Sequence, residues 1–205
     1  MTAPNHIAGG LVFTGLFASF MDVNVLANPY FIGCTVVGSL LPDADHTRSW
    51  IGKLVYPIAW WLHRRYGHRT ITHTLIAWLG LTGLVWLLGG NFNDGNEFTI
   101  LFLFAYLSHL VLDMMTLQGV PFLYPFMKNP CVLPAKPEMR FRTGDLRTET
   151  LAFSFFLFCG IFCYPLFANG FWTQYNRTFG GLKQLKNEFI LTIQSDLWRI
   201  KAIKK

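Results

Sequence analysis

Long uncharged apolar stretches separated by short polar segments are the main pattern in this chain of 205 residues. A helix needs ~20 mainly apolar residues, within a range of about 17–25, to cross a lipid bilayer. Five stretches are of roughly this length, and only the fourth contains a charged residue: Ile7–Met21, Val23–Leu41, Thr70–Asn93, Phe98–Leu117 and Thr150–Asn176. The pattern therefore predicts an all-α integral membrane bundle with four core spans and a fifth apolar segment.

The segments between these stretches differ in character. Asp43–Arg69 is basic, and its middle, Ile51–Tyr66, mixes apolar residues with tryptophan and arginine. That mixture predicts a helix in the membrane interface, which kinks or begins at Pro57. Gln118–Glu149 contains five prolines, so we expect an irregular segment there. Five glycines in the first two apolar stretches are expected to let helices approach closely: Gly9, Gly10, Gly15, Gly33 and Gly38.

Composition narrows the class of protein further. Hydrophobic residues make up 52% of the chain and charged residues 14%, whereas a soluble domain carries about 25% charged residues. This hydrophobicity excludes a disordered chain and disfavours a water-soluble fold. The net charge is +6, which we assign to Lys and Arg residues that gather on the cytoplasmic side and near anionic headgroups. We therefore expect membrane lipids as partners and no nucleic acid.

The distribution of positive charge predicts an orientation. Segments 43–69 and 118–149 together carry ten Lys and Arg residues, whereas the turns at Asp22 and 91–97 carry none. The positive-inside rule then places both basic segments and the N-terminus in the cytoplasm. No basic region precedes the first apolar stretch, so we expect the N-terminus to be retained.

The C-terminal part of the chain allows two paths through the membrane. Gly181–Lys205 has apolar residues at steps of three and four, which predicts a basic amphipathic helix. A single crossing by the fifth segment would put this basic tail outside, whereas a re-entrant hairpin would return it to the cytoplasmic surface, which is the path we favour. We treat residues 1–149, which carry the candidate site, and residues 150–205 as parts of one domain.

Histidine and aspartate residues gather where the four core stretches begin or end. An up-and-down bundle brings these four positions to one membrane face and to similar depth. Two of the residues, His109 and Asp113, are four apart and so share one helix face. The clustered residues are His6 before the first stretch, Asp43, Asp45 and His46 after the second, His68 and His73 around the start of the third, and His109 and Asp113 within the fourth.

These residue types favour a metal site. Ionisable residues inside a membrane span are costly and indicate function, and imidazole with carboxylate ligands suits Zn²⁺, with Mn²⁺ as the alternative. We expect one or two ions. A water activated by the metal would be the nucleophile, with Asp45 accepting its proton and Arg69 holding a phosphate oxygen. The expected direct ligands are His6, Asp43, His68, His109 and Asp113, with Asp45, His46 and His73 as ligands or as supports of ligands.

Four motifs in this order give the chain a resemblance to a known family. An N-terminal His, then LPDADH, GHRTITH and SHLVLD, resemble the YdjM-type inner-membrane proteins, which are described as LexA-regulated, membrane-bound metal-dependent hydrolases. The resemblance runs from about Met1 to Val132, and Thr70 stands where that family more often has glycine. It implies a multi-pass hydrolase of the bacterial inner membrane, under SOS control, with its metal site on the cytoplasmic side. A more distant similarity to zinc-dependent phospholipase C suggests a phosphoester substrate.

Taken together, the sequence predicts a membrane-embedded metal-dependent hydrolase acting on a phosphoester or a phospholipid-like amphiphile. The alternative is a non-catalytic membrane protein with a structural or transport metal site. Transport would require ligands near the bilayer midplane, whereas a structural zinc site would be closed by four protein ligands. Eight candidate ligands at one face favour catalysis, and the sequence leaves the oligomeric state open.

Overall fold

The computed structural model describes residues 1–89, 93–127, 129–177 and 179–180, and within them all regular structure is helical apart from isolated β-bridges. The expected all-α class is therefore confirmed for this part of the chain, whereas the expected amphipathic helix at 181–205 lies outside it. The α-helices are α1 (Ala3–Ser19), α2 (Pro29–Leu40), α3 (Trp50–Leu54), α4 (Tyr56–Tyr66), α5 (Leu75–Gly89), α6 (Gly95–Met114), α7 (Leu146–Phe162) and α8 (Tyr164–Asn169), and the 3₁₀ helices are η1 (Leu41–Asp45), η2 (Ile71–His73) and η3 (Pro137–Met139).

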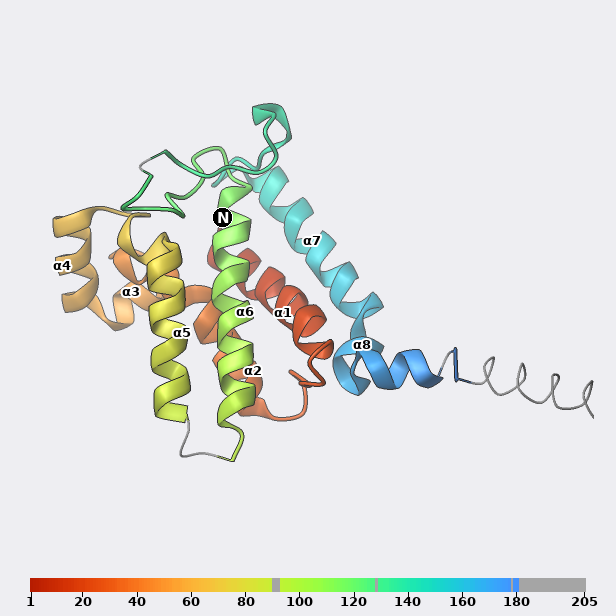
Figure 1. Ribbon diagram of the computed structural model, residues 1–205. Helices are drawn as coiled ribbons and strands as arrows, with labels where there is room; N and C mark the ends of the chain where they lie inside the picture. The colour runs from red at the N-terminus through yellow and green to blue at the C-terminus, as the bar shows by residue number, and fades with distance from the viewer. Residues whose placement is uncertain (90–92, 128, 178, 181–205) are drawn as a thin grey trace, which may run out of the picture.

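Helix α6 is the centre of the bundle and packs against α1, α2 and α5 (Figure 1). It is also the one helix in the described residues with the length and hydropathy to cross a membrane. The apolar helix α5 has 15 residues, and α1 and α2 have 17 and 12. Four core spans are therefore not established by helix length, although the four expected helices are present.

The second apolar stretch forms a shorter helix than expected because its first residues are irregular. Asp22, in the connection that follows α1, has a positive φ of 57°. The side chain of Asn28 then accepts a hydrogen bond from the Tyr30 N–H at 2.8 Å, and Pro29 occupies the first turn, where its missing N–H costs nothing. These signals start α2 at Pro29 and leave twelve residues for the helix.

The basic segment after α2 contains two short α-helices, α3 and α4, where the sequence predicts a single helix over Ile51–Tyr66 that kinks or begins at Pro57. Ser49 caps α3 by accepting a hydrogen bond from the Gly52 N–H at 2.9 Å. Pro57 lies in the first turn of α4, which confirms the prediction that a helix begins there. Trp60 and Trp61 are exposed on α4, where indole rings suit a membrane–water interface.

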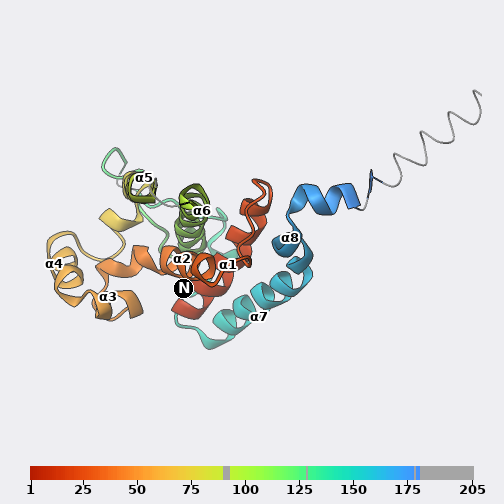
Figure 2. The ribbon, with the colours of Figure 1, turned by 90° about the horizontal axis from the view of Figure 1, so that it is seen from below.

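The fifth apolar segment is divided among α7, α8 and a further helical stretch at 171–177. Asp145 caps α7 through the Thr148 N–H, so the helix begins four residues before the uncharged stretch. It ends at Phe162, and Pro165 lies in the first turn of α8. Viewed from below, α7 lies along the side of α1 that faces away from α5 (Figure 2). The segment between α6 and α7 is mainly irregular, as its prolines predict.

Glycines allow close helix contacts at most of the expected positions. A Cβ added to Gly10 would lie 2.6 Å from the Ser39 Cβ, and one added to Gly38 would lie 2.8 Å from the Ala105 Cβ. Gly38 therefore lets α2 approach α6, and Gly10 lets α1 approach α2. The same expectation is wrong for Gly33, where an added Cβ would meet nothing within 4 Å.

Candidate metal centre

The four groups of histidine and aspartate residues meet near the C-terminal end of α6. His109 and Asp113 come from α6, Asp43 from η1 and His73 from η2. One ligand atom from each of these four residues lies within 4.8 Å of the other three. Three of the four side chains are fully buried, and Asp43 is 18% exposed. The fold thus gathers two imidazoles and two carboxylates around one point.

His6 completes this group from α1. Its Nε2 lies 3.4 Å from Asp113 Oδ1, and its ring stacks on that of His109. The Oδ2 atom of Asp113 lies 3.6 Å from His73 Nε2 and 3.7 Å from His109 Nε2. Histidines from α1, η2 and α6 therefore surround the Asp113 carboxylate. Separations of this size leave room for an ion to be bound between the side chains.

Backbone contacts fix the direction in which these rings point. The carbonyl oxygen of Ser39 accepts a hydrogen bond from His109 Nδ1 at 2.7 Å. Because a carbonyl only accepts, Nδ1 carries the proton and Nε2 of the neutral ring offers its lone pair to the centre. The Tyr106 hydroxyl donates to the carbonyl of Thr72 and so holds η2, which carries His73, against α6.

Histidine nitrogen atoms that lack hydrogen-bond partners indicate whether these residues fit a metal ion. Within the described chain, the Nε2 atoms of His6, His73 and His109 are buried and form no hydrogen bond. A buried polar atom without a partner costs about 1–3 kcal/mol, and three such atoms facing two carboxylates are unfavourable unless something binds between them. The donor set of imidazole nitrogen and carboxylate oxygen suits a divalent ion.

A second group of candidate ligands adjoins the first and shares Asp43 with it. Its members are Asp43, Asp45 and His68. Both oxygens of Asp45 are already used: Oδ1 accepts from His68 Nδ1, and Oδ2 accepts from the Arg69 N–H, each at 2.9 Å. Thr72 donates a third hydrogen bond at 2.8 Å. Asp45 therefore orients His68, whose Nε2 is left available.

The contacts within the cluster determine the ionisation of Asp43, Asp45 and His73, which lie in the 3₁₀ helices η1 and η2. Burial alone would raise the pKa of Asp45, but hydrogen bonds from His68 and His73 outweigh it and hold that pKa far below its usual value. Burial also opposes the charged form of His73, yet Asp113 and Asp45 raise its pKa to about 9. Asp43 has a lowered pKa because the nearby histidines, His109 first, outweigh its burial. The acids are thus ionised, as metal ligands must be.

The remaining sequence-predicted residues lie at the edge of the cluster. The His46 ring is tilted against His68 with centroids 4.6 Å apart. Arg69 reaches inward, because its Nη2 lies 2.9 Å from Asp113 Oδ2 and its Nη1 donates to Thr116 Oγ1 at 3.0 Å. All eight expected ligands or supports, together with Arg69, are therefore close to one another, while phosphate binding by Arg69 stays a prediction.

A cavity of about 680 Å³ adjoins the cluster, and we call it the polar cavity because charged side chains form part of its otherwise mainly apolar lining. Its lining includes Asp43, His46, His68, Arg48 and Arg69. This volume lies within the range of about 300–1,000 Å³ that is common for small-molecule sites. The candidate metal centre is therefore reachable by a ligand, although most of its side chains are buried.

Sequence reasoning missed the group that fixes the start of α1. The Glu149 carboxylate accepts hydrogen bonds from the Thr2 N–H at 3.1 Å, from the Thr2 hydroxyl at 2.8 Å, and from the Asn5 side chain. The α-amino group of Met1 lies 2.9 Å from Asp113 Oδ1. Glu149 thus positions the residue that precedes His6, and no local spacing reveals a contact between such distant parts of the chain.

The fold and this cluster define a helical protein with a buried histidine–aspartate centre that could hold a metal ion. The chain belongs to the family described as YdjM inner membrane protein, which matches residues 1–178. It is 32% identical over 145 residues to Inner membrane protein YdjM of Escherichia coli (strain K12), which covers 66% of this chain and 73% of that protein. The match to Inner membrane protein YdjM of Shigella flexneri has the same values.

A relative from another organism is similar over much of the same length. Uncharacterized protein YvsG of Bacillus subtilis (strain 168) is 28% identical over 126 residues, which cover 61% of this chain and 74% of that protein. No solved structure matches the chain. The family membership confirms the resemblance seen in the motifs, and the names of the relatives support a location in the bacterial inner membrane.

Proposed function

We propose that this protein is a membrane-embedded, metal-dependent hydrolase that cleaves a phosphoester, in a phospholipid or another amphiphile. The observation that carries the proposal is the set of three buried, unpartnered Nε2 atoms, of His6, His73 and His109, which surround the Asp113 carboxylate. The polar cavity beside them supplies room for a substrate.

Two ions fit the residues better than one. The first would be held by Asp43, His73, His109 and Asp113, with His6 beside them, and the second by Asp43 and His68, with Asp45 orienting His68. Asp43 belongs to both groups, so its carboxylate would help to hold either ion of a two-metal phosphoesterase site. We expect Zn²⁺ first and Mn²⁺ as the alternative occupant.

The chemistry needs an activated water and a bound phosphate. A divalent ion supplies the first by lowering the pKa of a coordinated water from 15.7 towards about 7. Such a water would bond to phosphorus through its oxygen as the bond to the leaving alcohol breaks, and a proton of the water would end on that alcohol. Arg48 and Arg69 line the cavity and can contact the phosphate oxygens. The three hydrogen bonds and the lowered pKa of Asp45 favour a positioning role over proton transfer.

The membrane arrangement that we propose has α1, α2, α5 and α6 as core spans and the metal centre on the cytoplasmic side. The two basic segments, 43–69 and 118–149, connect helices at the end of α6 where the cluster lies. Positive charge next to that end supports a cytoplasmic position. The family of inner membrane proteins supports the bilayer itself.

Bound metal is the first test. Detergent-purified protein is subjected to elemental analysis beside a double variant, His109→Ala with Asp113→Ala. We expect near-stoichiometric zinc or manganese in the wild type and its loss in the variant, after which soluble phosphodiesters and phospholipids are screened as substrates. Failure of the wild type to bind metal, even after reconstitution with excess ion, would contradict the proposal.

A closed structural metal site is the second candidate. It would need four protein ligands and no access for water. The partial exposure of Asp43 and the adjoining cavity favour an open site instead. Stoichiometric metal together with no hydrolysis of any phosphoester in the screen would support the structural role.

A further inference from the structure

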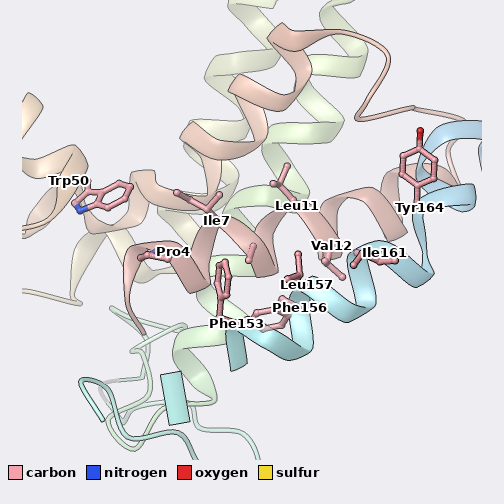
Figure 3. A pocket seen from close by; sticks show the side chains of 12 residues that line it. Pro4, Ile7, Leu11, Val12, Trp50, Phe153, Phe156, Leu157, Ile161 and Tyr164 are labelled. Carbon is pink, nitrogen blue, oxygen red and sulfur yellow. The ribbon is translucent and has the colours of Figure 1, made fainter. Parts of the chain in front are cut away.

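An apolar groove of about 660 Å³ lies between α1 and α7 (Figure 3). Figure 3 shows side chains from both helices along this groove, among them Ile7, Leu11 and Val12 from α1 and Phe153, Leu157 and Ile161 from α7. Ala8 and Gly160 also line it, and their small size leaves space between the two helices. No charged side chain lines this groove in the described part of the chain.

The groove continues into the polar cavity of the candidate metal centre. Pro4 and Trp50 line both, so one ligand can occupy the two spaces together. The apolar part lies between helices, whereas the polar part carries Arg48, Arg69 and candidate metal ligands. A ligand that matches this division has an apolar chain at one end and an anionic head at the other.

We propose that the groove between α1 and α7 binds an acyl chain of a phosphate-bearing membrane lipid, whose head lies in the polar cavity. The proposal rests on the proposed function for the statement that this lipid is a substrate, but binding itself needs no hydrolysis. The side chains of Leu157 and Ile161 are 55% and 70% exposed, so the groove is open along α7. A chain can therefore enter sideways from the bilayer rather than through water.

A guanidinium group at the polar end can bind the head. Arg48 and Arg69 line the cavity together with Asp43 and Glu149, and Arg69 already pairs with Asp113. Arg48 is therefore the cation that a phosphate can reach, through paired hydrogen bonds. Trp50 is 59% exposed at the junction, and an indole suits the level where lipid heads meet acyl chains. Along the groove and the cavity, apolar side chains are followed by an indole and then by guanidinium groups. The acyl chain, the interfacial region and the phosphate head of a lipid follow one another in the same order.

The test uses a photoactivatable phosphatidic acid with a diazirine in its acyl chain, added to full-length, metal-free protein in detergent micelles. Gly160→Phe fills the groove, because an added Cβ there makes only an ordinary contact, 3.6 Å from Val12 Cγ2. Gly80→Phe is the matched control, since Gly80 is exposed on α5 and an added Cβ meets nothing within 4 Å. Labelled peptides are identified by mass spectrometry.

We expect label on α1 and α7 in the wild type and in Gly80→Phe, and about tenfold less in Gly160→Phe, which corresponds to ~1.4 kcal/mol of binding. Leu157→Trp provides a second block, with Phe158→Trp as its control, because Phe158 is exposed and does not line the groove. If both blocking variants are labelled like the wild type, or the label lies outside α1 and α7, the proposal is wrong.

Hydrolysis of bis(p-nitrophenyl) phosphate, which has no acyl chain, is measured separately on metal-loaded protein. Label in the groove without any hydrolysis would overturn the enzyme proposal and leave the lipid site. Hydrolysis without label in the groove would overturn the lipid site and leave the enzyme proposal. If label appears in the groove only after deletion of residues 181–205, the groove is occupied by the chain's own C-terminal segment. If cross-links form there between two chains, the groove is occupied by a second copy. Either result would overturn the lipid proposal.

Discussion

The imidazole ring of His6 stacks on that of His109, with centroids 3.7 Å apart and planes 12° from parallel. The two residues lie on α1 and α6, so this contact joins the first helix to the central helix at the metal centre. The stack holds both rings beside Asp113, so that the Nε2 atoms of His6 and His109 lie 3.4 Å and 3.7 Å from its carboxylate oxygens.

His6→Phe separates these two roles, because phenylalanine retains an aromatic ring but has no ligand atom. We expect the variant to fold with near wild-type thermal stability and to bind zinc at least ~10-fold more weakly. Thermal unfolding and zinc titration in detergent measure the two properties. Unchanged zinc affinity would remove His6 from the ligand set.

Asp45→Asn tests the positioning role of Asp45. An amide cannot accept hydrogen bonds at both of its polar atoms, so the variant loses part of the support for His68 and Thr72. We expect metal affinity to fall by ~10–100-fold, with a parallel loss of any hydrolysis. Full metal content with lost hydrolysis would instead indicate that Asp45 accepts a proton. Asp22→Asn, a change of the same kind in the α1–α2 connection, is expected to alter neither.

Gly38→Ala is expected to destabilise the protein by ~1–3 kcal/mol, because its Cβ would overlap that of Ala105 and force α2 away from α6. The matched control is Gly33→Ala on the same helix, where space is open and alanine favours the helix by ~0.5–1 kcal/mol. Thermal unfolding in detergent gives the comparison. Equal stability of the two variants would mean that α2 does not approach α6 as closely as described.

The raised pKa of His73, about 9, predicts how the stability of the metal-free protein depends on pH. A group with a raised pKa in the folded state stabilises fully below its ordinary value, here 6.5, and this stabilisation is lost as the pH rises through about 9. Melting temperatures of EDTA-treated protein are expected to fall over that range. His73→Gln should flatten the profile, and an unchanged slope in this variant would assign the effect to another group.

The sequence predicted the candidate site well because its residues occur in short local patterns. His109 and Asp113 share a helix face by their spacing alone, and the group at Asp43 follows directly from the end of an apolar stretch. Once these helices pack side by side, the groups must meet. Whether a given side chain is a metal ligand or supports one was harder to predict. The hydrogen bonds to Asp45, for example, depend on the exact backbone path around Arg69, which has a positive φ of 58°.

Contacts that depend on helix rotation could not be read from composition. Gly33 and Gly38 belong to one helix, but five steps of ~100° place them about 140° apart around its axis. Only Gly38 faces α6. The start of α2 was likewise hidden, because apolar residues such as Val23 and Val25 are buried without being helical.

Helices α7 and α8 are attached to the α1 region at both ends of the apolar groove. At one end Glu149 binds Thr2 and Asn5, and at the other the Phe167 ring lies against Gly15. At the α8 end the groove stops where Phe167 meets Gly15, and at the other end it continues into the polar cavity. Its apolar part therefore has a definite length. From Pro4 to Val12 it follows eight residues of helix, or about 12 Å at ~1.5 Å per residue. Affinity for a series of lipids should therefore rise with acyl-chain length only until the chain fills this distance, and added methylene groups beyond it should contribute nothing.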